Sequence, residues 1–265
     1  MKFALEMAWA LPHSIREPVI SKFLLPRLAG RSLAVKTRDG FTLWCDPSDF
    51  IQNTVLRSGV WDHEVADAIR KHLKPGQLFC DIGANIGYFS MLAAHLGARV
   101  VAFEPQPSCA EAFRRNASIN GFKNTILHQL ALSIEEGEAI LYLEGDQNTG
   151  AASLHTRSGE TIAVKTRRLD DVLTEKPHLI KMDIEGAEVR ALEGASRILT
   201  GPDRPPVICE VSEFSLRQLG NSKDQLFDLM GGHGYRAEII SRIRRSNAVT
   251  HAVYFQYDVL FQPID

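Results

Sequence analysis

The sequence has no apolar run of the roughly 20 residues that a membrane-spanning helix needs. Its first eleven residues are apolar apart from Lys2 and Glu6, and the apolar pattern continues to Ile20 and Phe23. Because Glu6 interrupts the run and no small-residue cleavage site follows, the segment differs from a secretory leader. We expect residues 1–32 to form a helical extension that packs on the domain or touches a membrane surface.

The chain also lacks a surplus of positive charge, because its formal net charge is −2. A global basic field that would attract nucleic acid is therefore excluded. Arg242, Arg244 and Arg245 form one small basic cluster, but such clusters are common on solvated faces. The sequence predicts no nucleic-acid partner, and it leaves the oligomeric state open.

Cysteine is scarce, with four residues at positions that show neither paired nor metal-type spacing. Cys80 and Cys209 lie within apolar strand patterns, so buried free thiols are expected. The pattern predicts no metal site and a reducing, cytoplasmic setting.

The segment from Phe79 to Gly87 carries the main functional signal. An apolar run ends at Asp81, glycines follow at 83 and 87, and a helical pattern begins at once. Glycine has no Cβ, so backbone N–H groups in such a turn can approach a ligand. The next strand pattern, 99–103, ends in Glu104, where doubly wound sheets place the acid that binds ribose hydroxyls. These features indicate an enzyme with a nucleoside cofactor.

The glycine spacing indicates which cofactor. A dinucleotide site has Gly-x-Gly-x-x-Gly, whereas this chain has Asp-x-Gly-x-x-x-Gly with Ala84 inside the loop. Asp81 would repel a pyrophosphate, but it suits S-adenosylmethionine, which carries an ammonium and a sulfonium and no phosphate. A tight strand-to-helix turn without a ligand remains the structural alternative.

Strand and helix patterns alternate from residue 77 onward, which predicts an α/β fold with a mostly parallel sheet and helices on both faces. The expected strands cover 77–81, 99–103, 125–130, 178–183, 206–210, 235–239 and 253–261, and the helices cover 64–73, 87–96, 107–120, 186–198 and 222–232. The last strand follows its predecessor without a helix, so we expect an antiparallel insertion or edge strand. A β-hairpin is predicted at 33–45, short strands at 132–143 and 161–168, and a lid-like loop at 145–159.

A second strand-to-helix junction runs from Lys181 to Glu188. It places Asp183 on the same rim as Asp81, Glu104 and Glu210, beyond the carboxyl ends of the strands. Glu185 and Glu188 are three apart, so they are expected to share a face of the following helix. Lys181 lies within an apolar strand and needs a carboxylate or substrate partner, because an unpaired buried charge is costly.

These motifs resemble the FkbM-type S-adenosylmethionine-dependent methyltransferases across about residues 35–260. The matching segments are Asp81–Ser90, Ala102–Pro105, Asn116–Gly121, Arg168–Asp171 and Ile180–Glu188. The glycine loop occurs in many methyltransferases, whereas Lys-x-Asp-x-Glu-Gly-x-Glu is far more specific. The resemblance implies a Rossmann-like class I methyltransferase domain at 33–265 that methylates a hydroxyl of a sugar, glycan or polyketide-type product.

The resemblance also implies residue roles. It assigns cofactor contacts to Glu64, Asp81, Gly83, Asn85, Gly87, Glu104, Ala131, Leu132 and Asp183. Within this set, Glu104 would hold the ribose, and Ala131 with Leu132 would flank the adenine.

An alcohol is a weak nucleophile, so methyl transfer to it needs a general base. Asp183 and Glu185 are the predicted catalytic residues, and Glu188, Glu210 and His155 are weaker candidates. Paired carboxylates that hold Mg²⁺ are a minor alternative. Two other functions stay open: a nicotinamide-dependent oxidoreductase, and a noncatalytic partner protein that retains the cofactor pocket.

Overall fold

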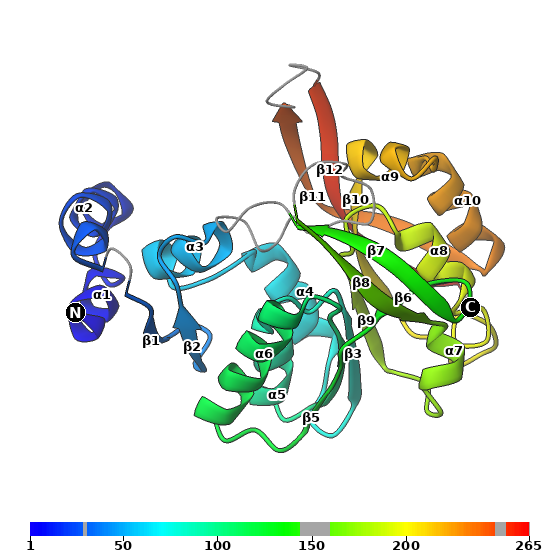
Figure 1. Ribbon diagram of the computed structural model, residues 1–265, viewed down its shortest axis with the longest axis horizontal. Coiled ribbons are helices and arrows are strands. Elements are labelled where there is room, and N and C mark those ends of the chain that lie inside the picture. Colours follow the sequence, from blue (N-terminus) through cyan, green and yellow to red (C-terminus); the bar gives the residue numbers. More distant parts are fainter. Residues whose placement is uncertain (29–30, 144–159, 247–252, 265) are drawn as a thin grey trace.

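The computed structural model describes residues 1–28, 31–143, 160–246 and 253–264. Its centre is a seven-stranded sheet in the order β11-β12-β10-β9-β3-β4-β5 (Figure 1). The strands of this sheet are β3 Leu78–Ile82, β4 Arg99–Phe103, β5 Thr125–His128, β9 Leu179–Met182, β10 Val207–Ser212, β11 Tyr235–Ser246 and β12 Val253–Pro263. Strands β5, β4, β3, β9 and β10 pair in parallel, so their carboxyl ends meet at one rim.

Strand β12 is antiparallel to both of its neighbours, β10 and β11. The expected antiparallel insertion or edge strand is confirmed, because β12 is inserted between β11 and β10 and β11 is an antiparallel edge strand. The reason is the long β11–β12 hairpin, whose register begins at Tyr235 opposite Pro263. The hairpin returns the chain between the strand it has just left and β10.

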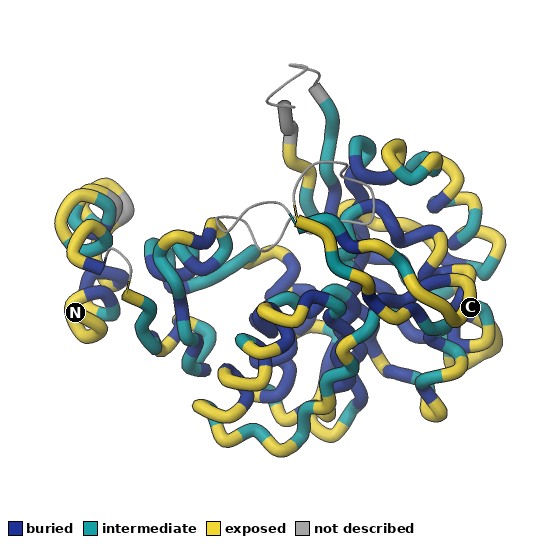
Figure 2. Tube along the Cα trace, in the orientation of Figure 1, coloured by how far each residue is buried: buried dark blue, intermediate teal, exposed yellow. Residues whose placement is uncertain are grey.

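Helices cover both faces of the sheet, as predicted. They are α4 His63–His72, α5 Tyr88–His95 and α6 Pro107–Ile119 on one face, and α7 Leu169–Val172, α8 Glu188–Glu193, α9 Glu213–Gln218 and α10 Lys223–Gly232 on the other. Alternate strand residues divide between the two cores: Phe79 packs toward α5, whereas Cys80 packs toward α8. The central strands β3, β9 and β10 are accordingly buried along nearly their whole length (Figure 2).

The predicted hairpin forms from β1 Leu33–Lys36 and β2 Thr42–Cys45. Helix α6 holds it, because Asn116 Oδ1 accepts the Trp44 N–H at 2.9 Å and Asn120 Oδ1 accepts the Thr42 N–H at 2.7 Å. Helix α3, Phe50–Ser58, follows and was not predicted. A second small sheet has the order β6-β8-β7, formed by Ala131–Leu132, Glu160–Arg167 and Gly137–Leu143.

The N-terminal segment is helical, as expected, and consists of α1 Lys2–Ala8, α2 His13–Val19, η1 Ile20–Leu24 and η2 Leu25–Leu28. It packs on the domain: Leu5 and Trp9 belong to the hydrophobic core of the α5 face, and the Trp9 indole donates to the Leu56 carbonyl at 3.0 Å. Among the described helices, we find none with the length and apolar character to cross a bilayer. The expected lid, with His155, lies outside the described residues.

Candidate active site

The glycine loop between β3 and α5 lies at the centre of the rim. Gly83, Asn85 and Gly87 all have positive φ, at 76°, 50° and 90°. A Cβ on Gly83 would lie 1.8 Å from the Asp183 carbonyl oxygen, because the loop after β3 touches the loop after β9. Glycine is therefore required at 83 both for its backbone conformation and for this contact.

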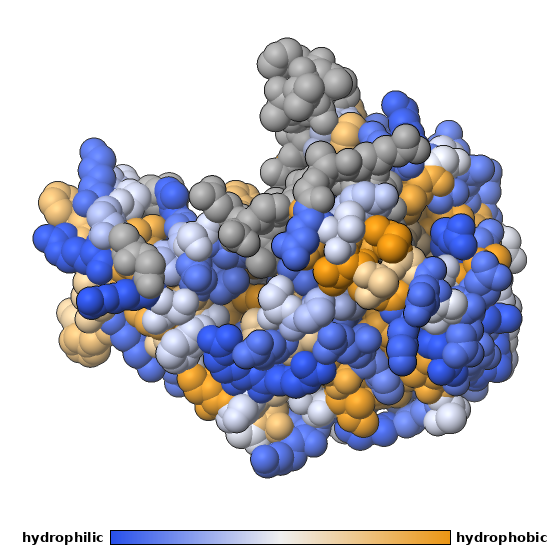
Figure 3. Space-filling model, in the orientation of Figure 1, coloured by the Kyte–Doolittle hydropathy of each residue, from blue (hydrophilic) through white to orange (hydrophobic). Residues whose placement is uncertain are grey.

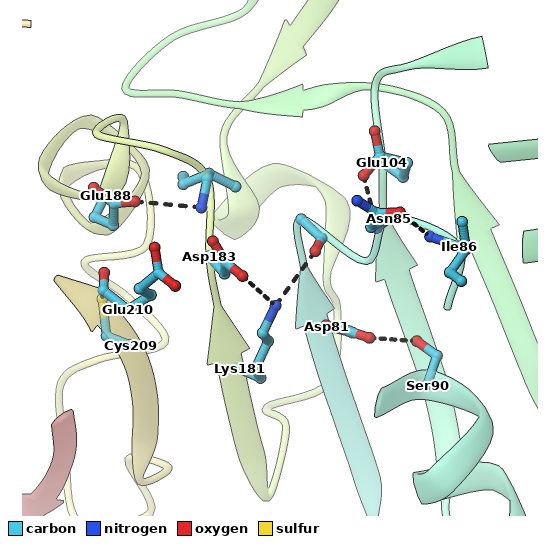
Figure 4. A network of polar contacts seen from close by, with 12 residues as sticks. Asp81, Asn85, Ile86, Ser90, Glu104, Lys181, Asp183, Glu188, Cys209 and Glu210 are labelled. Carbon is cyan, nitrogen blue, oxygen red and sulfur yellow. Dashed lines mark hydrogen bonds and ion pairs between the residues drawn. The ribbon is translucent and has the colours of Figure 1, made fainter. Parts of the chain in front are cut away.

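Two buried carboxyl groups lie beside this loop. Glu104, directly after β4, accepts the Asn85 N–H at 2.8 Å and the Gln106 N–H at 2.9 Å (Figure 4). Asp81 accepts the Ser90 hydroxyl at 2.6 Å, while its other oxygen, Oδ1, has no hydrogen-bond partner among the described residues. Burial raises the pKa of Asp81, and it raises the pKa of Glu104 to about 7.

Lys181, from β9, is only 5% exposed. Its ammonium lies 3.3 Å from Asp183 Oδ2, 3.4 Å from the Gly83 carbonyl and 5.2 Å from the centre of the Phe89 ring. Burial opposes its charge, but the carboxylates around it, above all that of Asp183, outweigh burial and raise the pKa of Lys181 above its usual value. The carboxylate partner expected from the sequence is therefore Asp183.

Asp183, Glu185 and Glu210 form a carboxylate cluster, in which one oxygen of each lies within 4.8 Å of the others. Glu185 accepts the Ser215 hydroxyl at 3.2 Å, and Gln256 donates to Glu210. Burial, and then the charges of Asp183 and Glu185, raise the pKa of Glu210 well above its usual value. The spacing is compatible with a divalent cation, and the predicted absence of a metal stays a prediction.

Glu188 does not share a helical face with Glu185. Helix α8 begins at Glu188 itself, because Glu185 and Gly186 have positive φ and form the preceding turn. The buried Glu188 carboxyl accepts the N–H groups of Ile184 and Gly186, at 3.3 and 3.1 Å. Glu188 thus stabilises, through these two hydrogen bonds, the turn that contains Asp183 and Glu185.

Residues 81–237, which contain this site, match the family model described as the methyltransferase FkbM domain. The chain belongs to the FkbM methyltransferase family. The match contains the glycine loop, Glu104, the Lys181–Glu188 junction and Glu210. Family membership favours methyl transfer over the nicotinamide alternative, and it implies S-adenosylmethionine as the cofactor.

Similar proteins agree with this assignment. The chain is 30% identical to the 31-O-demethyl-FK506 methyltransferase FkbM of Streptomyces tacrolimicus over 62% of this chain and 74% of that protein. It is 26% identical to Methyltransferase 1 of Beauveria bassiana over 60% and 74%. Wild-type Trm5b from Pyrococcus abyssi shares the fold, with a TM-score of 0.50 at 14% identity over 88% of this chain and 56% of Trm5b.

The other predicted residues of this FkbM-family site are more dispersed. Glu64 is exposed in the first turn of α4 and pairs with His63 at 3.1 Å. Ala131 and Leu132 are buried in β6, shortly after β5 ends. Their cofactor contacts stay predictions, as do those assigned to the glycine loop.

Two acids of the same site were missed by sequence reasoning. Half-buried Asp62 caps α4 and interacts electrostatically with Lys181 and Asp183. Asp258, from β12, is buried and accepts the Ser241 hydroxyl, and burial followed by the charge of Asp62 raises its pKa to about 7. Asp62 could have been found as an N-cap acid before a helical pattern, whereas nothing local marks Asp258.

The buried Glu188 gives the FkbM-family protein a pH-dependent stability. Burial raises its pKa from 4.5 to about 7, so the folded state binds the extra proton between these values. The free energy of unfolding is therefore expected to fall as pH rises from about 4.5 to 7, by up to about 3 kcal/mol for this group, and not to change further below that window. Glu188→Gln, which keeps an acceptor oxygen, should reduce the loss between pH 5 and pH 8.

Urea denaturation at pH 5 and pH 8 measures this effect, with Glu193→Gln as the control because Glu193 is exposed on the same helix. If Glu188→Gln loses as much stability as the wild type between the two pH values, Glu188 is not the titrating group.

Proposed function

We propose that this protein is an S-adenosylmethionine-dependent O-methyltransferase that methylates a hydroxyl of a small molecule, either a sugar or glycan or a polyketide-type product. The observation that carries the proposal is the pair of buried carboxyls, Asp81 and Glu104, at the tips of the adjacent parallel strands β3 and β4. A pyrophosphate at this place would meet both acids, whereas a cationic nucleoside without phosphate complements them.

The cofactor would be held by the glycine loop and the two acids. The unpartnered Oδ1 of Asp81 is an acceptor that suits a cationic donor. The Glu104 carboxylate, already fixed by two backbone N–H groups, has further lone pairs for ribose hydroxyls. When bound, S-adenosylmethionine supplies an electrophilic methyl group.

Asp183 is the proposed general base. Of the cluster it is the acid held by the buried ammonium of Lys181, and its side chain is 33% exposed, so an acceptor can reach it. Glu185, which Ser215 orients, lies beside it and would hold a second polar group of the acceptor. Glu210 is a poorer candidate because burial, and then the charges of Asp183 and Glu185, raise its pKa and so disfavour its carboxylate form.

The choice of oxygen as the methylated atom has support from a relative. The name of the Streptomyces tacrolimicus protein places its activity at an oxygen, the 31-O position of FK506. A carboxylate base beside an open rim fits the same kind of acceptor, since a hydroxyl must lose its proton as the new bond forms.

Titration calorimetry with S-adenosylhomocysteine and with NADH tests the cofactor assignment. We expect binding of the first and none of the second. Glu104→Gln should weaken binding of the first roughly ten- to hundred-fold, because hydrogen bonds to a charged group contribute about 1.5–3 kcal/mol. Glu111→Gln, on the exposed face of α6, is the control.

Binding of NADH, or an unchanged affinity in Glu104→Gln, would contradict the assignment. Incubation with labelled S-adenosylmethionine and fractionated cell extract then tests catalysis. A labelled product that survives in the wild type and disappears with Asp183→Asn supports the enzyme. Cofactor binding without any labelled product would favour the noncatalytic alternative.

A further inference from the structure

The N-terminal helices expose an unusual amount of apolar surface. Phe3 is 73% exposed, Met7 59%, Ile15 52% and Phe23 56%. Phe3 and Met7 are four residues apart in α1, so they lie on one helical face. Contiguous exposed apolar surface, such as this face of α1, marks an interaction site, and Ile15 and Phe23 add exposed apolar area on the following helices.

The opposite side of the same segment is firmly attached to the domain. Leu5 and Ile20 are fully buried, and Trp9 is 6% exposed. The half-buried Glu6 accepts the Lys36 N–H at 3.0 Å, which ties α1 to β1. The exposed face is therefore held in place by a packed element and does not result from a loose end.

The net charge of the N-terminal segment indicates which kind of partner covers its exposed apolar face. Residues 1–28 contain four lysines and arginines and two acids, a net charge of +2, whereas the whole chain carries −2 and the remainder therefore −4. Lys2, Lys22, Arg27 and Arg31 are all exposed. Hydrophilic residues in blue and apolar residues in pale orange lie side by side on the N-terminal helices (Figure 3).

We propose that the N-terminal helices, residues 1–28, dock the protein on the surface of an anionic lipid bilayer. The four apolar side chains enter the interface between headgroups and acyl chains, and the basic residues contact the lipid phosphates. An electrically neutral partner would leave the positive charge beside the apolar face without a counter-charge, whereas an anionic bilayer supplies both an apolar layer and negative phosphates. The docking is independent of methyl transfer, because no residue of the carboxylate cluster takes part.

Co-sedimentation with vesicles tests the proposal, using the full chain without methyl donor. The wild type should sediment with vesicles of equal parts phosphatidylcholine and phosphatidylglycerol and much less with phosphatidylcholine alone. The double variant Phe3→Ser, Phe23→Ser should bind the anionic vesicles at least roughly ten-fold more weakly, because burying one such side chain contributes about 1.5–3 kcal/mol. Raising the salt concentration should also weaken binding.

Ile126→Ser is the matched control, since Ile126 is 58% exposed on the distant edge strand β5. Circular dichroism confirms that the variants are folded, and light scattering reports self-association. Three results would overturn the proposal: equal sedimentation of the double variant, binding that does not depend on lipid charge, and a wild-type dimer that the double variant abolishes without any vesicle binding.

Discussion

Replacement of Asp183 by asparagine is expected to lower kcat for methyl transfer about a hundred- to ten-thousand-fold, the usual contribution of a general base. Asparagine keeps the size of the side chain but cannot take a proton. The backbone contact of residue 183 with Ile82, at 3.0 Å, does not involve the side chain and remains. Steady-state kinetics with the acceptor identified from extract measures the loss.

Asp171→Asn is the matched control, because Asp171 is exposed on α7 and lies outside the cluster. It should keep wild-type kcat. A variant at 183 that keeps kcat and raises only KM for the methyl donor would show that Asp183 contacts the cofactor and that the base is elsewhere. Glu185→Gln then becomes the next variant to measure.

Gly83→Ala is expected to destabilise the fold by about 3 kcal/mol more than Gly76→Ala does. Both glycines have nearly the same positive φ, 76° and 79°. A Cβ at 76 meets no atom within 4 Å, whereas a Cβ at 83 overlaps the Asp183 carbonyl oxygen. At either position alanine destabilises the fold by about 1–2 kcal/mol because the backbone there is left-handed, so this cost cancels in the comparison. The expected difference comes from the steric overlap at 83 and is at the upper end of the cost of overpacking.

Urea denaturation of the two variants gives this difference directly. If Gly83→Ala and Gly76→Ala lose equal stability, the loops after β3 and β9 are not in contact, and the geometry of the site is wrong. If Gly83→Ala is too unstable for a denaturation curve, limited proteolysis of its soluble fraction replaces the equilibrium measurement, and we expect rapid cleavage. Gly83→Ser cannot replace it, because serine has the same Cβ.

Much of the fold could be predicted because its strands are short apolar runs between clear turn residues. An acid lies near the end of β3 and two glycines follow it, and Asp183 directly follows β9, so both tips could be placed on one rim. All four cysteines are buried thiols, which confirms the expectation for Cys80 and Cys209. Helix α3 was missed, although Asp49 accepts the Gln52 N–H and Gly59 ends the helix with a φ of 80°, the usual signals of helix boundaries.

The rest depends on information that no local pattern contains. Asp258 reaches the site because β12 is inserted beside β10, and the order of strands in a sheet is not encoded in the periodicity of either strand. The separation of Glu185 from Glu188 depends on the positive φ at Glu185, which is uncommon for a residue with a side chain and delays the start of α8.

The insertion of β12 also determines when the sheet can be completed during synthesis of the chain. Strand β11 has β12 as its one neighbour in the sheet, and β12 is the last of the described elements. A chain translated as far as β10 already contains β3, β4 and β9, while the border of the sheet at β10 is still uncovered. Completion of the sheet, and the arrival of Asp258 beside the other acids, therefore waits until β12 has been translated.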